Sequence, residues 1–379
     1  MAKKAYIGVG GTARKVKKIY FGVGNTARKV KKAYIGIGGI ARPFFSGGEV
    51  VYYGTTTALS IARQSAAGAS VGKYGLIAGG AKTTATGNTN SSYYTNSVVT
   101  YDNNLTVNES VATLPSVRNG AVGASAKNYA LIAGGEKAGY DSDSVVSYDT
   151  NLTRTTLAAL SEARTGAAAA IAGEYVLVAG GEYTYDEVDA YDVDGNKYSG
   201  DIEPLGTARG YLAGAAVGSF AIFAGGRTSA STSARSSAVD VYDSDLGKFE
   251  SVESLGFSAW NIAGASLRKY ALFAGGSKST RAYVATINAY DEDLTLYENV
   301  GELSSARKCM AAVLDETAIF SGGTRTDVID ADLTTIKQID PLSIDRSGMA
   351  VTVAGDFALF AGGYTSGGSI SGVVDVYTV

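Results

Sequence analysis

The sequence predicts an all-β fold, a seven-bladed β-propeller, from a phrase that recurs through residues 49–379. An apolar, strand-like run ending in a glycine pair occurs seven times, from "YGLIAGG" to "FALFAGG". Successive first glycines are 40 to 55 residues apart, which is the length expected of a four-stranded propeller blade. These first glycines are Gly79, Gly134, Gly180, Gly225, Gly275, Gly322 and Gly362.

Each unit continues in the same order after its glycine pair. A variable polar loop leads to a strand ending in Tyr-Asp, as in "VVTYD", and then to a turn, another strand, and a Leu four residues before an Arg. The fourth unit has Ala259 in place of this Arg, and the sixth has Ile329 in place of the Tyr. We expect the Arg side chains to pair with carboxylates or carbonyls between blades and the Tyr side chains to be core residues. The repeated Arg residues are Arg118, Arg164, Arg209, Arg307 and Arg346.

This order of motifs resembles the kelch repeat, in which Gly-Gly is followed by Tyr-Asp and then by an aromatic residue seven positions beyond the Tyr. The resemblance covers about residues 49–379 and implies a propeller. Three units hold an aromatic at that place, three others do not, and the Trp usual in the family is missing there. The aromatic residues are Tyr198, Phe249 and Tyr297, and the departures are Asn108, Thr155 and Ile336.

The last unit ends at "VVDVYTV" without an outer strand, and a matching strand precedes the first unit. The segment "VVYYGTTTALSIAR" places Tyr53 at the position of the outer-strand aromatic and spaces Leu59 from Arg63 as in the other units. We therefore predict that an N-terminal strand completes the last blade, which closes the ring and hides its sheet edges.

The composition removes several classes of enzyme. The chain has no histidine, which excludes Ser-His-Asp and Cys-His nucleophiles and histidine metal sites. Its one cysteine, Cys309, excludes a disulfide framework and is expected to be buried on an inner strand. Carboxylate clusters such as "YDEDL" raise calcium and hydrolase hypotheses, although none has the spacing of an EF-hand loop. The prediction is a non-enzymatic protein with no cofactor and no metal site.

One face of the propeller is the predicted binding surface. Because the strands of a blade alternate in direction, the loops after Gly-Gly and the Arg-containing links should share a face. These loops vary most and set Tyr among Ser, Thr, Gly and Asn, a composition suited to binding a glycan or a protein. Trp260 either binds a ligand there or fills the space of the Arg that its unit lacks. The predicted face comprises Tyr93, Tyr94, Tyr140, Tyr183, Tyr185, Tyr211, Trp260, Tyr283 and Tyr364.

Residues 1–45 form a predicted separate domain, a basic arm before the propeller of residues 46–379. Three copies of a 14-residue phrase, the first being "KKAYIGVGGTARKV", carry eleven of the 33 basic residues and no acidic ones. The remainder then has 22 basic and 36 acidic residues, a net charge of −14. No phosphate-binding G-x-x-x-x-G-K-[ST] motif occurs. Apolar runs and Gly-rich turns predict a small β-meander that a partner completes. The predicted anchoring residues are Lys3, Lys4, Arg14, Lys15, Lys17, Lys18, Arg28, Lys29, Lys31 and Lys32.

The repeated phrase of the arm resembles N-terminal segments of virion proteins from bacteriophages and prophages of Gram-positive hosts. The resemblance implies a virion structural protein, made in the bacterial cytoplasm, whose arm binds other virion proteins, with the tail or baseplate as the expected location. Its propeller would contact a host cell-surface glycan or protein, and several copies would assemble on the particle. The chain shows no apolar membrane span and no signal peptide at its start.

Three other functions remain open at the level of sequence. The protein could decorate the capsid or neck of a virion. It could be an intracellular bacterial scaffold whose basic arm binds nucleic acid, although the Lys and Arg residues follow no known reader fold. It could also be a glycan-active enzyme that uses carboxylates.

Overall fold

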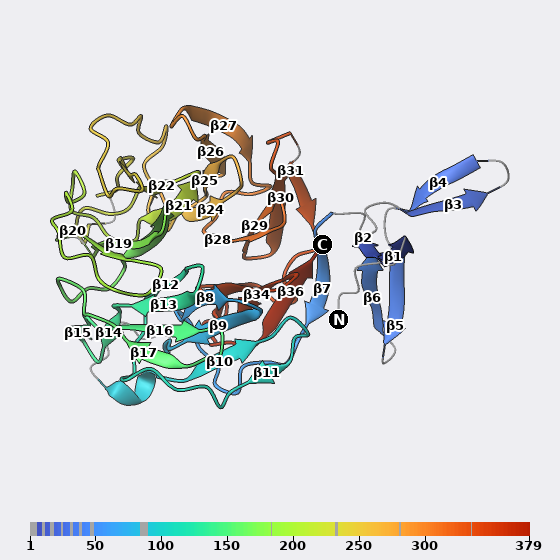
Figure 1. Ribbon diagram of the computed structural model, residues 1–379, viewed down its shortest axis with the longest axis horizontal. Helices are drawn as coiled ribbons and strands as arrows, with labels where there is room; N and C mark the ends of the chain where they lie inside the picture. The colour runs from blue at the N-terminus through green and yellow to red at the C-terminus, as the bar shows by residue number, and fades with distance from the viewer. Residues whose placement is uncertain are drawn as a thin grey trace.

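The computed structural model confirms the predicted all-β, seven-bladed propeller (Figure 1). No helix within its described residues is long and apolar enough to cross a membrane. Side chains are described for residues 49–83, 90–182, 184–231, 234–279, 282–334 and 336–379, and backbone alone for six short strands before them.

The three copies of the basic phrase form three separate hairpins. In the described residues each sheet of the arm has two strands, and both come from the same copy, as in the pairing of Val9 with Thr12. The predicted meander is therefore wrong in its connectivity. Two residues, rich in glycine, separate the paired strands, and such a short connection favours reversal within each copy. The pairs are β1 (Tyr6–Val9) with β2 (Thr12–Lys15), β3 (Ile19–Val23) with β4 (Thr26–Val30), and β5 (Ala33–Ile37) with β6 (Ile40–Phe45).

The first four blades follow the repeat in chain order, and each is an antiparallel sheet. In blades three and four a single bridge, Tyr191 to Lys197 and Tyr242 to Lys248, stands where the other blades have a fourth strand. Their strands are β8 (Ala67–Val71), β9 (Tyr74–Ala78), β10 (Val98–Tyr101) and β11 (Val107–Asn108); β12 (Val122–Ser125), β13 (Tyr129–Ala133), β16 (Val145–Asp149) and β17 (Arg154–Thr156); β18 (Ala168–Ala172), β19 (Tyr175–Gly181) and β20 (Tyr185–Tyr191); and β21 (Ala213–Val217), β22 (Phe220–Ala224) and β23 (Val239–Tyr242).

The last blade contains both the end and the beginning of the propeller. Strand β7 pairs with β36, and Tyr53 packs edge-to-face on Phe357 with 5.3 Å between ring centroids, as Tyr198 does on Tyr175 in blade three. The predicted closure is confirmed. The strands of the last three blades are β24 (Ala263–Ser266), β25 (Ala271–Ala274), β26 (Thr286–Tyr290) and β27 (Leu296–Glu302); β28 (Met310–Leu314), β29 (Thr317–Gly322), β30 (Arg325–Asp330) and β31 (Ile336–Ile339); and β33 (Ala350–Ala354), β34 (Phe357–Ala361), β36 (Val374–Thr378) and β7 (Val51–Thr55).

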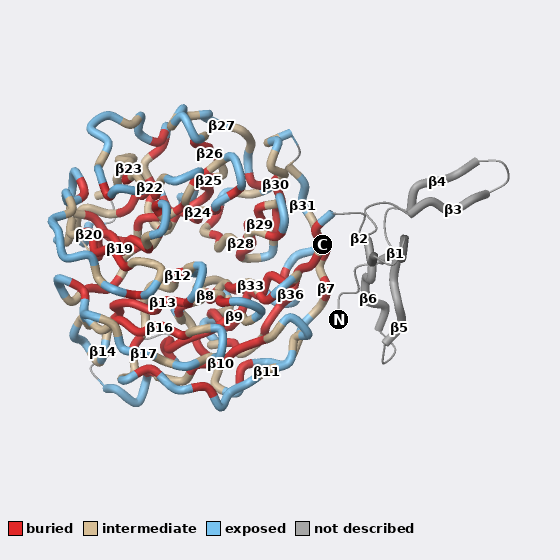
Figure 2. Tube along the Cα trace, in the orientation of Figure 1, coloured by how far each residue is buried: buried red, intermediate tan, exposed pale blue. Residues whose placement is uncertain are grey.

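The core lies between blades rather than under any one of them. Seven apolar clusters of described residues each join two neighbouring blades, and buried residues follow the strands throughout the ring (Figure 2). The first strand of each blade contacts the first strand of the next, so these strands surround the axis. Space there is scarce, because a Cβ at Gly123 would lie 2.2 Å from the carbonyl oxygen of Gly68.

The same backbone hydrogen bond closes all seven blade junctions. The second glycine of each pair donates its N–H to the carbonyl of the link Arg of the next blade, as from Gly80 to Arg118 at 2.8 Å and from Gly363 to Arg63 at 2.7 Å. Ala259 accepts the equivalent bond from Gly226 at 2.9 Å. A Cβ at Gly79 would lie 2.6 Å from the Arg118 carbonyl, and the φ of Gly79 is +66°. Glycine is therefore required at this contact.

The link arginines are buried, and their partners differ between blades. In four blades the Arg pairs with an Asp on the third strand, while in blades one and two Val99 and Val146 hold the place of that Asp. Arg118 then donates to the carbonyl and the hydroxyl of Ser144. In blade five Ala259 is accompanied by Asn288 at the Asp position, so both members change together. The ion pairs are Arg164–Asp189, Arg209–Asp240, Arg307–Asp327 and Arg346–Asp375.

The tyrosines of the Tyr-Asp motif are fully buried, and their hydroxyls have partners. Each donates to a backbone carbonyl of the preceding blade or link, as Tyr101 does to Thr57 at 2.8 Å. The expected core role is confirmed. The other bonds run from Tyr148 to Ala112, Tyr191 to Ala158, Tyr242 to Glu203, Tyr290 to Glu253 and Tyr377 to Asp340.

Removing a link arginine should cost most where its partner is a carboxylate. Arg346→Ala leaves the fully buried Asp375 without its cation, and we expect a loss of about 3–5 kcal/mol in the free energy of unfolding. Arg118→Ala leaves only carbonyl and hydroxyl acceptors, with an expected loss of about 1–3 kcal/mol. Urea unfolding measures both. The double variant Arg346→Ala/Asp375→Asn, which reproduces the pair of blade five, should recover part of the larger loss. Equal losses in the two single variants would contradict this account.

Candidate functional site at the axial mouth

The links and the loops after the glycine pairs meet at one end of the propeller axis, as predicted. The residue after a link Arg forms a β-bridge with the residue after a glycine pair, for example Gln64 with Ala81. Since each link leads directly into an innermost strand, these residues surround the end of the axis. We call them the axial mouth: Gln64 and Ala81, Asn119 and Glu136, Thr165 and Glu182, Gly210 and Arg227, Trp260 and Ser277, Ser347 and Tyr364, with Lys308 at the corresponding place in the sixth blade.

A collar of hydrogen bonds runs around the axial mouth from link to link. Four of its bonds join a backbone N–H to a carbonyl, and in a fifth the Thr165 hydroxyl donates to the Gly120 carbonyl. Tyr211 donates to Gly166 at 2.8 Å while its own φ is +56°, which is rare for a bulky residue and costs backbone strain. The other backbone bonds run from Ser65 to Gly348, from Gly120 to Ser65 and from Asn261 to Tyr211.

The collar is interrupted at the sixth blade. Three residue steps separate Arg307 from Met310, which begins the inner strand, whereas four separate Arg63 from Ala67. Among the described residues, no equivalent backbone bond joins the links between Asn261 and Gly348. Lys308 lies at this interruption.

Four side chains gather beside the interruption and form what we call the Trp260 cluster, namely Tyr211, Arg227, Trp260 and Lys308. The rings of Tyr211 and Trp260 meet edge-to-face with centroids 6.0 Å apart. The guanidinium carbon of Arg227 lies 4.6 Å from the Trp260 ring centroid, and Lys308 Nζ lies 4.2 Å from it. Two cations thus contact one indole ring. Trp260 Nε1 is buried and has no hydrogen-bond acceptor within the described part of the chain.

The two cations of the Trp260 cluster affect each other electrostatically. Burial, followed by the charge of Arg227, lowers the pKa of the Lys308 ammonium below its usual value. Within the described residues, Lys308 takes part in no ion pair. Arg227 donates from Nη2 to the Ala230 carbonyl. The cluster is therefore a partly buried positive charge on a propeller of negative net charge.

Carboxylates occupy the axial mouth at the second and third blades. Asp141 belongs to the short hairpin of β14 (Glu136–Lys137) and β15 (Tyr140–Asp141). Burial raises its pKa to about 6, with further contributions from the charges of Glu182 and Glu136. No group of three or more metal-binding side chains occurs among the described residues. The arrangement favours a carboxyl group that remains protonated up to mildly acidic pH.

The other acidic clusters serve the turns. Asp291 of "YDEDL" accepts the N–H groups of Asp293 and Thr295 through Oδ1, and Asp243 accepts those of Asp245 and Gly247 in the same way. These carboxylates close the turn between the third and fourth strand positions of their blades. Their spacing reflects turn geometry.

The structure brings two predicted face residues together and removes one. Tyr211 and Trp260 are in contact at the axial mouth, and Tyr364 lies over Gly348, where a Cβ would be 3.1 Å from its ring. Tyr94 is buried, and its hydroxyl donates to Glu136 at 3.1 Å, so its place in an exposed face is a wrong prediction. Tyr94 is buried because its strand-like segment pairs with Ala81 beside the blade.

The remaining predicted residues are dispersed. Tyr93, Tyr140 and Tyr283 are exposed, but they belong to blades one, two and five. Tyr185 is half-buried at the start of β20, and burial followed by nearby carboxylates raises the pKa of its hydroxyl. Tyr183 and the ten basic residues of the arm lie outside the residues whose side chains are described.

The sequence analysis missed Arg227, Lys308 and the carboxylates of the axial mouth. The signal that could have found them is their phase in the repeat, directly after a glycine pair or a link Arg. The Trp260 ring contacts Tyr211, Arg227 and Lys308 at the axial mouth. Phe257 and Ala259 are buried in the apolar cluster between blades four and five, whereas Trp260 is half-buried.

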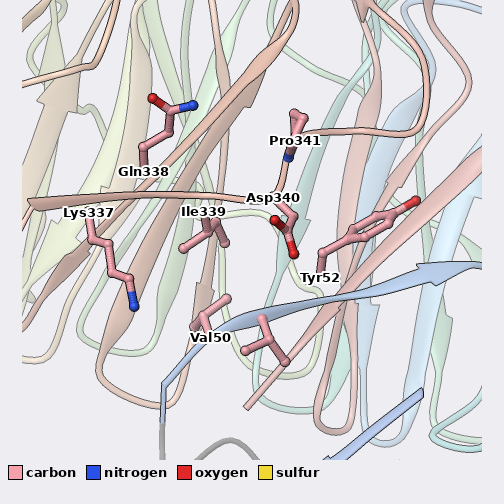
Figure 3. A pocket seen from close by; sticks show the side chains of 8 residues that line it. Val50, Tyr52, Lys337, Gln338, Ile339, Asp340 and Pro341 are labelled. Atoms are coloured by element: carbon pink, nitrogen blue, oxygen red, sulfur yellow. The ribbon is translucent and has the colours of Figure 1, made fainter. Parts of the chain in front are cut away.

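Two shallow grooves lie at outer strands, away from the axial mouth. One, of about 300 Å³, is lined by Val50 to Tyr52 on β7 and by Lys337 to Pro341 on and after β31 (Figure 3). Lys337 also pairs there with Glu49 at 3.2 Å. The other, of about 450 Å³, lies beside Asp189 and Tyr198 in blade three. Neither contains a member of the Trp260 cluster.

The raised pKa of Asp141 predicts a pH-dependent effect of its removal. Stability from the protonated carboxyl is fully present below about pH 4 and is lost as the pH rises through about 6. Asp141→Asn should therefore be more stable than the native chain above pH 6, by up to about 1 kcal/mol after solvent screening, and equal to it near pH 4. Urea unfolding at the two pH values measures this, with Asp143→Asn as the control for loss of one charge. A gain that is the same at both pH values would contradict the assignment.

Comparison with known proteins supports the fold alone. No protein-family model matches the chain, and no curated protein is significantly similar to it. The chain is similar to a solved structure titled "Structure of YjhT", with 13% sequence identity and a TM-score of 0.54. The match covers 86% of this chain and 97% of that one. The feature shared with the solved protein is therefore the propeller architecture.

Proposed function

We propose that this chain is a non-enzymatic structural protein of a bacteriophage particle, located in the tail or baseplate. The propeller acts as a binding module that presents its axial mouth to a glycan or protein of the host surface. The basic hairpin arm attaches it to other virion proteins. The Trp260 cluster is the observation that carries the binding role.

The side chains at the axial mouth vary between blades, and the propeller fold does not depend on which residues stand there. The glycine contacts, the buried Arg and the buried Tyr recur from blade to blade, whereas the residue after the glycine pair varies from Ala81 to Glu136 to Arg227. The blades that have Ala81 or Ser277 at that position each form a four-stranded sheet of the same kind. The two cations beside the Trp260 ring are therefore not part of the repeated frame, and the charge of Arg227 disfavours the charged form of Lys308. Such a perturbation is typical of a functional site.

The small size of the arm's hairpins and the positive charge of the arm both favour attachment to a partner. Isolated two-stranded hairpins are at best marginally stable in water, so three of them need a partner surface. The arm carries eleven cations without an anion, which suits an acidic partner. The resemblance of the repeated phrase to virion proteins supplies the kind of particle.

Truncating the aromatic residues of the axial mouth should weaken binding to the host surface. We expect Trp260→Ala to weaken binding of the full chain to host wall polysaccharide about 30-fold or more, as for a central aromatic anchor, and Tyr211→Ala to weaken it less. Phe249→Ala and Tyr297→Ala, which remove exposed rings at the outer-strand position of blades four and five, are the matched controls. Surface plasmon resonance measures the affinities. Unchanged binding in Trp260→Ala, or equal losses in the controls, would overturn the axial mouth as the binding site.

Removing the arm should separate attachment from binding. A chain lacking residues 1–45 should retain the melting temperature and ligand affinity of the propeller but should no longer be incorporated into purified particles. Immunoblotting of the particles and calorimetry of the free protein measure the two properties. Incorporation at the level of the full chain would overturn the anchoring role.

The second candidate is an enzyme acting on surface glycans. Asp141, with a pKa of about 6 and with Glu136 and Glu182 nearby, has the properties of a general acid. Release of saccharide products by the native chain, but not by Asp141→Asn, would favour this function over the non-enzymatic one.

A further inference from the structure

We propose that the Trp260 cluster binds a single anionic group, a carboxylate or a phosphate, carried by a saccharide. This inference rests on the binding role proposed above and names the chemistry of its ligand. The site consists of Lys308 and Arg227 as cations and Trp260 as ring and donor.

The first support is the charge of Lys308, which takes part in no ion pair among the described residues. Burial and Arg227 both lower the pKa of Lys308, which means that the two cations repel each other in partly dry surroundings. The buried link cation Arg346, by contrast, lies against the carboxylate of Asp375. An anion bound beside Lys308 would supply the counter-charge that this ammonium lacks among the described residues.

The second support is the set of hydrogen-bond donors. An ammonium group and a guanidinium both form charge-assisted bonds to carboxylate or phosphate oxygens. Trp260 Nε1 is a third donor, buried and without an acceptor among the described residues. Lys308 lies at the interruption of the collar, where no backbone bond joins neighbouring links among the described residues.

The third support concerns the kind of ligand. The propeller has a net charge of −14, and Glu136, Asp141 and Glu182 lie at the same mouth, so a polyanion would be repelled. This disfavours nucleic acid and highly acidic peptides and favours a ligand with one isolated negative charge. The rings of Trp260 and Tyr211 have an apolar body and a polar edge, which suits the mixed surface of a sugar.

The test compares three forms of one oligosaccharide: neutral, carboxylated and phosphorylated. Isothermal titration calorimetry with the full chain should show at least one anionic form binding about 10- to 100-fold more tightly than the neutral form, and the tighter one identifies the anion. Lys308→Met and Arg227→Met should remove this preference, so that the anionic and neutral forms bind with equal affinity. Lys269→Met and Arg268→Met, which remove exposed cations from the loop between β24 and β25, should retain the preference.

Thermal unfolding of each variant serves as the control for correct folding. Lys308→Met should be no less stable than the native chain, because it relieves a repulsion, so a loss of the anion preference cannot be attributed to unfolding. Equal binding of neutral and anionic forms that still depends on Trp260 would overturn this inference and leave the binding role intact. A preference that survives both mouth variants, or that is lost equally in the loop controls, would overturn the assigned cations. Tighter, Lys308-dependent binding of an acidic peptide or of single-stranded DNA would overturn the saccharide, and absence of all binding would overturn the proposed function as well.

Discussion

The propeller depends on one hydrogen bond repeated at each blade junction, from the second glycine of a blade to the link carbonyl of the next. Because donor and acceptor are both backbone atoms, the bond survives where Ala259 replaces the Arg. The first glycine allows the link to approach, since a Cβ at Gly79 or Gly134 would overlap its carbonyl oxygen. The buried Arg and Tyr side chains reinforce a junction that the backbone has already defined.

This division of labour explains why the side chains at the axial mouth can differ from blade to blade. The residues that follow the glycine pair and the link Arg are held in place by backbone contacts, so their side chains can change without loss of the ring. Ala81, Glu136 and Arg227 occupy equivalent positions with opposite or no charge. Carboxylates then lie at blades two and three, while cations lie at blades four and six. The axial mouth thus carries negative charge on one side and positive charge on the other, although every blade has the same backbone architecture.

Features that recur could be predicted from the sequence, and features that occur once could not. The strands before each glycine pair, the buried Tyr and the closing strand with Tyr53 all leave signatures that seven copies make visible. Lys308 of the Trp260 cluster lies in a link that is one residue shorter, between Arg307 and Met310, than the links of the other blades. A repeat search does not reveal this single difference. Tyr94 has the composition of a loop residue, but its pairing with Ala81 buries it. In the arm, the phrase shows where strands form and leaves undecided whether copies pair with themselves or with each other.

Closure of the ring by β7 has a consequence for how the chain folds. Val51 pairs with Thr378, so the first strand of the propeller to be synthesised has its partner at the far end of the propeller sequence. Contacts of such long sequence separation form slowly, because the loop that they close must be ordered first. Until β36 has been made, β7 and the faces of blade seven lack their neighbours, and an unpaired strand edge invites association with other chains.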